Sequence, residues 1–407
     1  MSFVRGPGTS DQERTKHQEQ RTKDVQVVVT PRCASTFAAL WLATALLPRT
    51  AAVKHQHLAR LDASRISMAC EYAIEAYGPD ADRLPRIVDE AFDEVDRIDR
   101  LMSHYNAKSP LSRVNREAAQ HPVAVEPELF DFIADAMRYH RDSGGAFDIT
   151  VGPLMKAWGF FRGEGRVPPD GELAAARHHV GGAHVMLNPI SKTIGFDEPG
   201  VELDLGGIAK GYAVDRVVGL LRRRQIAAAL VSAGGSTIYG LGAPPGRDGW
   251  DVMIQDPIDP RRVALTVQLK DRALSVAGSS EKSFEAGGLT YSHIMDPRTG
   301  RPAQGVLSVA VLASSGTAGD ALDDAFFVLG SEGSRGYVSQ LRDIEAFFFL
   351  PASAHLKSER ASARLANQPP PRRRRSAEAP AKAEAPKARR RPDANRRWTL
   401  VHLRAGF

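Results

Sequence analysis

Two amphipathic helices followed by a series of short strands form the pattern that most constrains the fold of this chain. The first helix carries one apolar stripe at three- and four-residue steps, made of Leu84, Ile87, Val88, Ala91, Phe92, Val95, Ile98 and Leu101. The second carries Leu129, Phe132, Ile133, Ala136 and Met137, and the pair Gly144-Gly145 ends it.

After these helices the pattern becomes strand-like. Runs typical of strands cover residues 229–232, 251–254, 263–269, 306–312 and 346–350, and helices are expected to begin near Ile208 and near Asp320. Helices inserted irregularly among strands favour an α+β fold with a mostly antiparallel sheet over repeated βαβ units.

The chain divides into three parts. Residues 1–61 form an N-terminal extension, residues 62–365 a folded domain, and residues 366–407 a basic tail rich in Pro, Arg and Ala. From about residue 366 to 396 this tail is of low complexity and cannot bury enough apolar surface to fold. The formal net charge of +6 comes from this tail. The charge therefore says little about what the folded part binds.

An apolar run at residues 34–47 (ASTFAALWLATALL) bears on the location of the protein. It has the length of a signal-peptide hydrophobic region and falls short of the roughly 20 residues that span a bilayer. We expect export to the periplasm or association with the cytoplasmic membrane. The alternatives are a buried or anchoring helix and a chance apolar stretch, and the protein is cytoplasmic if the run is not a signal. The two cysteines, Cys33 and Cys70, cannot form a disulfide framework.

The segment DLGGIAKGYAVD, from Asp204 to Asp215, has the pattern of an apolar strand that ends in a Gly-Gly turn and opens a helix. Free amides at a helix N-terminus, two glycines and Lys210 suit a phosphate or diphosphate. Neither a P-loop nor a Rossmann fingerprint is present. A glycine-rich turn with a solvated lysine is an equally good interpretation of this segment alone.

Three acidic residues, Asp320, Asp323 and Asp324, lie at i, i+3 and i+4 on a predicted apolar helix. Like charges at this spacing repel one another unless a cation lies between them, and oxygen ligands suit a hard divalent cation. Acidic residues favoured by a helix N-terminus are the alternative. The apolar run that follows, residues 325–329, indicates burial and favours the metal site.

Two further segments contain candidate functional residues. His293 is expected on a strand that leads into the turn DPRTG, where a histidine acts as a base or only fills space. Phe147 and Asp148 follow the end of the second helix, and an aromatic ring beside a carboxylate suits a planar ligand. Core packing is the commoner reason for such an aromatic residue.

Taken together, the order and spacing of these segments resemble the family of FAD:protein FMN transferases, also called the ApbE family. The resemblance covers about residues 62–335 and rests on GGAFDITVGPLMKAWGF, DLGGIAKGYAVD, SAGGSTIYGLG, HIMDPRTGRP and DALDDAFFVLG. It implies an ApbE-like architecture related to the T-fold. It also implies the family reaction, in which FMN from FAD is attached to a threonine hydroxyl of an acceptor protein through a phosphoester bond and AMP is released.

The resemblance also assigns residues to the site. The flavin contacts it implies are Met68, Tyr105, Ala146, Phe147, Asp148, Asp204, Lys210 and the main chain at Ile294. The implied metal is Mg²⁺, held by the carbonyl of Gly207 with Asp320, Asp323 and Asp324. Lys210 would stabilise charge on the diphosphate, and His293 would deprotonate or orient the incoming threonine.

Four departures from the family pattern concern catalysis more than folding. The chain has Met68-Ala69-Cys70 where Met-Gly-Thr is usual, and Asp324 where a threonine is usual. It has Val276-Ala277-Gly278 in place of Thr-Ser-Gly, and Ser236 where an acidic residue often follows the GG turn. A flavin-binding relative without transfer activity and a Mg²⁺-dependent FAD pyrophosphatase are therefore alternatives. A different class, nucleic-acid binding, is supported only by the tail, for which association with a membrane surface is the better interpretation.

Overall fold

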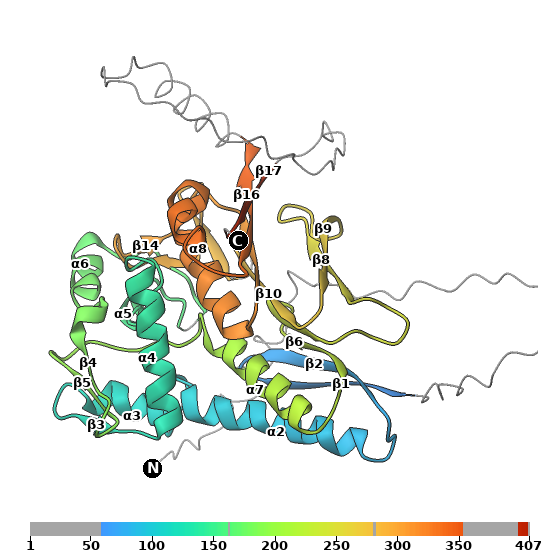
Figure 1. The fold of residues 1–407 in the computed structure, drawn as a ribbon. Helices are drawn as coiled ribbons and strands as arrows, with labels where there is room; N and C mark the ends of the chain where they lie inside the picture. The colour runs from blue at the N-terminus through green and yellow to red at the C-terminus, as the bar shows by residue number, and fades with distance from the viewer. Residues whose placement is uncertain (1–57, 162, 280–281, 353–397, 406–407) are drawn as a thin grey trace, which may run out of the picture.

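The computed structural model describes residues 58–161, 163–279, 282–352 and 398–405, and its centre is an eight-stranded sheet (Figure 1). The strand order is β1-β2-β6-β7-β10-β15-β16-β17, and every neighbouring pair is antiparallel. The predicted α+β class with a mostly antiparallel sheet is confirmed. The strands are β1 (Ala59–Ser67), β2 (Cys70–Gly78), β6 (Ala228–Ala233), β7 (Thr237–Leu241), β10 (Arg272–Gly278), β15 (Ser308–Ala313), β16 (Glu345–Pro351) and β17 (Trp398–Arg404).

Both faces of this sheet are buried in its middle strands. In β6, Val231 points into the larger core with the helices, whereas Leu230 points into a second core on the opposite face. A hairpin of β8 (Trp250–Gln255) and β9 (Val263–Leu269) supplies the other side of that second core. Because side chains alternate along a strand, a sheet covered on both faces is apolar at nearly every position, as β6 and β15 are.

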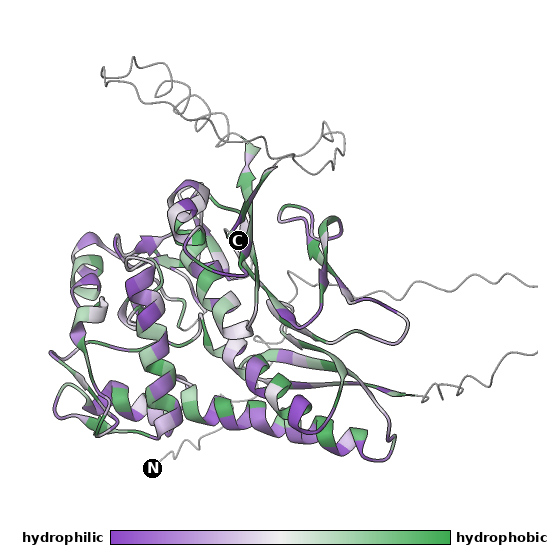
Figure 2. Ribbon diagram, in the orientation of Figure 1, coloured by the Kyte–Doolittle hydropathy of each residue, from purple (hydrophilic) through white to green (hydrophobic). Residues whose placement is uncertain are grey.

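Three helices pack against the central sheet on the side of the larger core (Figure 1). They are α2 (Leu84–Met102), α7 (Ala209–Arg223) and α8 (Gly316–Val338). All eight residues of the predicted α2 stripe are buried, and in Figure 2 this helix carries both hydrophobic and hydrophilic colours along its length. The carboxylate of Asp215, on α7, accepts hydrogen bonds from the backbone amides of Gly316 and Thr317 at 2.6 and 2.8 Å. Asp215 therefore fixes the N-terminus of α8 against α7.

The remaining elements lie beside the central sheet, to the left in Figure 1. They include the small sheet β3-β5-β4 and the second predicted amphipathic helix, α4. In chain order they are α3 (Pro110–Glu117), β3 (Val123–Ala124), α4 (Pro127–Asp142), α5 (Gly152–Ala157), α6 (Asp170–His178), η1 (Gly182–His184), β4 (Val185–Asn188) and β5 (Thr193–Phe196). Two further hairpins are formed by β11 (Ser283–Ala286) with β12 (Leu289–Ser292) and by β13 (Met295–Asp296) with β14 (Arg301–Pro302).

The structure corrects the predicted extent of the folded domain. Residues 398–404, assigned from the sequence to the tail, form β17 and pair with β16 along its whole length. The ring of His402 stacks on Phe347 with centroids 4.3 Å apart. The basic segment 353–397 thus connects two paired strands, and it lies outside the described residues. At the other end β1 begins at Ala59, before the predicted start at residue 62.

Within the described ranges, no helix is both long enough and apolar enough to cross a membrane. The apolar run 34–47 and Cys33 fall outside those ranges, and the prediction of export is not tested by the structure.

Candidate active site

The Gly-Gly turn before α7 brings the backbone against the acidic residues of α8. The apolar strand predicted to end in this turn is not formed, because residues 201–205 join no sheet, but the Asp204 amide donates to the Ile149 carbonyl at 2.7 Å. The Asp204 side chain then accepts a hydrogen bond from the Gly206 amide at 2.8 Å. A Cβ atom added to Gly207 would lie 2.4 Å from Oδ2 of Asp324. Only glycine allows this approach, which places the Gly207 backbone and the Asp324 carboxylate together as the resemblance implies.

The carboxylates of Asp320 and Asp323 are buried on α8, with 4% and 3% of each residue exposed. Asp320 accepts hydrogen bonds from the Gly211 amide at 2.9 Å and from the Thr237 hydroxyl at 3.1 Å. Burial, followed by the charges of Asp324 and Asp320, raises the pKa of Asp323 well above its usual range. Three carboxylates held this closely need a positive charge, so the residues present fit a hard divalent cation.

Lys210, in the first turn of α7, supplies one positive charge to this region. Its Nζ donates to Oγ of Ser236 at 2.7 Å, and Ser236 belongs to the turn between β6 and β7. The charge of Lys210 partly opposes the rise in the pKa of Asp323 that burial and the other carboxylates cause, and it adds to the lowering of the pKa of His293 by burial and Lys282. Lys210 therefore lies within electrostatic reach of the acidic cluster and of the candidate base.

His293 was predicted on a strand, but it lies directly after β12. Its side chain is half-buried. Its backbone amide donates to the Lys282 carbonyl at 2.9 Å, and its Nδ1 has no hydrogen-bond partner among the described residues. Burial, then the charges of Lys282 and Lys210, lowers the pKa of His293 to about 3. The imidazole is therefore neutral near pH 7 and can accept a proton. The adjacent Ile294 carbonyl already accepts a hydrogen bond from the Ala303 amide.

The loop that carries Ala146, Phe147 and Asp148 is buried, with Phe147 packed edge-on against Tyr139. Core packing, the alternative raised for Phe147, is what the structure shows for its ring. Asp148 is held by its own chain: it accepts hydrogen bonds from the amide and the hydroxyl of Thr150 at 2.8 and 2.6 Å. Its other oxygen lies 3.2 Å from Nδ1 of His140, whose pKa this contact raises.

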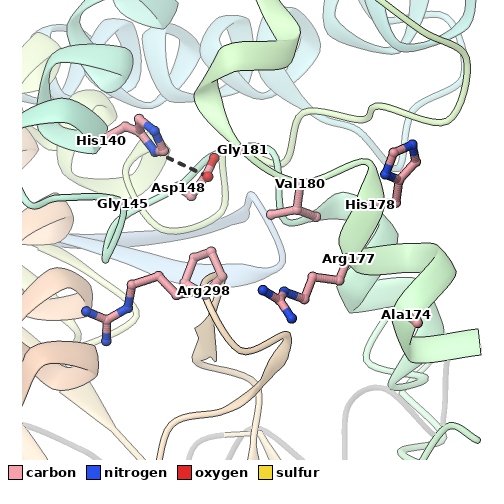
Figure 3. A pocket seen from close by; sticks show the side chains of 10 residues that line it. His140, Gly145, Asp148, Ala174, Arg177, His178, Val180, Gly181 and Arg298 are labelled. Atoms are coloured by element: carbon pink, nitrogen blue, oxygen red, sulfur yellow. Dashed lines mark ion pairs between the residues drawn. The ribbon is translucent and has the colours of Figure 1, made fainter. Parts of the chain in front are cut away.

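Asp148 also lines a cleft of about 530 Å³ that contains none of the α8 carboxylates, Lys210 or His293. Figure 3 shows this cleft, with His140 and Asp148 on one side and Arg177 and His178 of α6 on the other. Asp148 faces this cleft, whereas the Phe147 ring joins the loop to the acidic cluster, because its Cε2 would lie 3.5 Å from a Cβ atom on Gly207.

Tyr105 lies on an aromatic shelf that is open to solvent, with 56% of the residue exposed. It stacks on Phe161 with centroids 5.0 Å apart and an interplanar angle of 22°. His104 lies under it, and Nδ1 of His104 is 3.3 Å from Oδ1 of Asp204. Such a shelf can stack a planar ring beside the acidic Asp204.

Met68 lies at the tip of the β1–β2 hairpin, with a positive φ of 49°. The Tyr72 hydroxyl donates to its sulfur at 3.1 Å. The neighbouring Cys70 packs against the turn that leads to Ser236, because a Cβ on Gly234 would lie 2.9 Å from Cβ of Cys70. The hairpin tip is therefore held next to the turn that contacts Lys210.

Sequence reasoning missed several residues of the site. His104, Phe161, Thr237 and Ser275 belong to it through contacts with Tyr105, Asp204, Asp320 or Asp323. Of these four residues, His104 could have been proposed from the sequence, because it is adjacent to Tyr105, a predicted flavin contact. Thr237 and Ser275 come from strands whose pairing with each other is not visible from local pattern.

Fold and site together define an α+β protein with a buried acidic cluster at a glycine turn, suited to a phosphorylated ligand with a divalent cation. The model of the ApbE family matches residues 68–348. The chain belongs to the ApbE family.

Relatives and solved structures agree with this family. A FAD:protein FMN transferase from Vibrio cholerae is 37% identical over 251 residues, which are 59% of this chain and 73% of that protein. One from Treponema pallidum is 32% identical over 301 residues, covering 70% of this chain and 83% of that protein. The crystal structure of the ApbE protein from Thermotoga maritima has a TM-score of 0.66 at 30% identity, covering 72% of this chain and 94% of that one.

Proposed function

We propose that this protein is a flavin transferase that moves FMN from FAD onto an acceptor protein. The observation that carries the proposal is the buried carboxylate cluster of α8, held against the Gly207 turn with Lys210 and His293 nearby. This arrangement occurs in a member of a family whose characterised relatives are named FAD:protein FMN transferases.

We propose further that the acidic cluster binds Mg²⁺ through Asp320, Asp323 and Asp324 with the Gly207 carbonyl. The raised pKa of Asp323 supports a cation there, since a bound ion would relieve the repulsion among the carboxylates. Mg²⁺ would offset negative charge on the diphosphate of FAD, which is its usual role in phosphoryl transfer.

The residues of this chain then have distinct tasks. Lys210, held by Ser236, stabilises charge on the diphosphate, and the Tyr105 shelf stacks a planar ring of FAD. The neutral His293 takes the proton of the acceptor hydroxyl, for which we propose a threonine. The hydroxyl oxygen attacks the phosphorus of the FMN half. The bond between that phosphorus and the bridging oxygen of the diphosphate breaks, and AMP leaves with this oxygen.

The transfer is tested with the full chain, FAD, Mg²⁺ and a threonine-bearing flavin acceptor domain. Covalent flavin fluorescence of the acceptor on a denaturing gel, together with one AMP released per flavin attached, is the expected result. AMP and free FMN without labelled acceptor would replace the proposal with a FAD pyrophosphatase. FAD binding without AMP would leave a flavin-binding protein, the alternative raised by Val276-Ala277-Gly278 and Asp324.

Replacing His293 with Ala is expected to lower FMN transfer by about 10²-fold, the lower end for loss of a general base. FAD binding should be kept, because the change removes a proton acceptor and no charge. Since the pKa of His293 is about 3, we expect the wild-type rate to show no inflection from this residue between pH 5 and 8. Single-turnover rates across that range are the measurement. His121→Ala, at an exposed histidine whose ring nitrogen contacts the Pro122 carbonyl, is the control, and a normal rate in His293→Ala would exclude the role.

The proposals on location rest on the sequence. The apolar run 34–47 supports export to the periplasm or association with the cytoplasmic membrane, and the basic segment supports contact with an anionic membrane surface. The near-neutral charge outside the basic segment argues against specific nucleic-acid binding.

A further inference from the structure

A cluster of histidine and acidic side chains lies outside the proposed active site, at the C-terminal end of α6. His178 is the last residue of α6 and His179 is its C-cap. Glu198 lies in the loop that follows β5, on the opposite side of the cluster. Residues from two separate segments thus meet where no step of the proposed reaction needs them.

The ligand atoms of this cluster converge. Oε2 of Glu198 lies 3.3 Å from Nε2 of His178, and Oε1 of Glu198 lies 3.0 Å from Nδ1 of His179. One ligand atom from each of the three residues lies within 4.8 Å of the other two. Ligands of a tetrahedral ion with bonds of about 2.0 Å are separated by roughly 3.3 Å, so small rotations of these side chains suffice for coordination.

The cluster is held in place by its surroundings. A Cβ atom on Gly200, whose φ is +105°, would lie 2.8 Å from the ring of His179, so this ring rests directly on the glycine backbone. On the other side, Nδ1 of His184 lies 2.9 Å from Asp197 and 3.8 Å from Glu198. His179, Glu198 and His184 are each less than a third exposed, whereas His178 is open to solvent.

The chemistry of the cluster favours a metal over ion pairs alone. Three imidazole rings gathered around the carboxylate of Glu198 form a ligand set for a transition metal. Imidazole nitrogen with carboxylate oxygen is typical of Zn²⁺ and uncommon for Mg²⁺. The C-terminal end of α6 also favours a cation, because the helix dipole is negative there.

We propose that His178, His179 and Glu198 bind one Zn²⁺ ion, with His184 or water completing the coordination. The ion joins the end of α6 to the loop after β5. Since His178 also lines the cleft opposite Asp148 (Figure 3), zinc fixes one wall of that cleft. This proposal does not depend on flavin transfer.

Calorimetry tests the site with the full-length protein, freed of metal with a chelator and titrated with Zn²⁺ in excess Mg²⁺. The excess Mg²⁺ keeps the carboxylates of α8 from contributing. We expect one Zn²⁺ per chain and a higher melting temperature in its presence. His179→Gln and Glu198→Gln should each weaken binding by about 10²-fold or more, since even the loss of a residue that only hydrogen-bonds to a metal ligand costs roughly 10–100-fold.

His402→Ala is the matched control, because His402 also pairs with a glutamate, Glu345, at 3.2 Å but belongs to no group of three possible metal ligands among the described residues. It should bind Zn²⁺ as the wild type does. Substitution with Co²⁺ gives a second readout that does not depend on unfolding, since its visible absorption reports nitrogen and oxygen ligands. No Zn²⁺ binding by the wild type, or equal binding by His179→Gln, Glu198→Gln and the control, would overturn the proposal.

Discussion

Asp323→Asn is expected to lower FMN transfer by about 10³-fold while leaving the metal-free protein at least as stable as the wild type. The loss of rate follows because a hard cation contributes several kcal/mol to stabilising charge in phosphoryl transfer, and each 1.36 kcal/mol is about tenfold in rate. The amide keeps the size of Asp323 and can still bond to the Ser275 hydroxyl. It removes one of three carboxylates from a buried cluster.

The sign of the stability effect follows from the pKa of Asp323. Burial and the charges of Asp324 and Asp320 raise that pKa in the folded state, so above the usual carboxyl range the folded protein holds a proton that the unfolded chain has lost. The stability from this group is complete below the unfolded pKa and is lost as the pH rises through the folded value. Metal-free wild type should therefore lose stability as the pH rises, and Asp323→Asn should lose less.

Thermal unfolding at several pH values, with and without Mg²⁺, measures both parts of this prediction. Mg²⁺ should raise the melting temperature of the wild type more than that of the variant, because the ion stabilises only a folded state that binds it. Glu332→Gln is the control; Glu332 lies in α8 beyond the break at Gly330, where φ is 67° and ψ is 174°. Glu332 is exposed and pairs with Arg335, so its loss should change neither rate nor response to Mg²⁺. Normal FMN transfer by Asp323→Asn would exclude the proposed metal site.

The parts of the fold that could be predicted are those fixed by local periodicity. The stripe of α2 and the strand β9 appear where the pattern placed them, since one face or alternate residues must be buried. The hairpin of β1 and β2 and the last strand, β17, were not predicted. For β17 the reason is physical: its partner is separated from it by a basic segment, and pairing across such a distance leaves no local pattern.

The candidate site shows the same limit. The spacing of Asp320, Asp323 and Asp324 predicted one acidic face, and the structure places two of these carboxylates in the core and the third against Gly207. The spacing could not predict which residues of other elements form hydrogen bonds with this acidic face. Gly211 and Thr237 reach Asp320 from another helix and another strand, and only the packed fold brings them there.

Gly211→Ala is expected to have the largest effect on stability, because Gly211 lies where α7 and α8 touch. A Cβ atom there would lie 2.2 Å from the carbonyl oxygen of Gly316 and 2.8 Å from Cβ of Asp320. The first atom belongs to the backbone at the start of α8, which Asp215 holds in place, so it cannot move aside as a flexible side chain would. We expect the free energy of unfolding to fall by about 3 kcal/mol or more, the upper range for overpacking a core.

Gly219→Ala provides the control on the same helix. Its added Cβ would meet only the end of the Arg223 side chain, at 3.4 Å, so the helix propensity of alanine should stabilise the protein by up to about 1 kcal/mol. Urea unfolding of both variants measures the difference. Gly211→Ala should also lose FMN transfer under conditions where it remains folded, because the Gly211 amide donates to Asp320. Equal stability of the two variants would mean that α7 and α8 do not approach each other at this glycine.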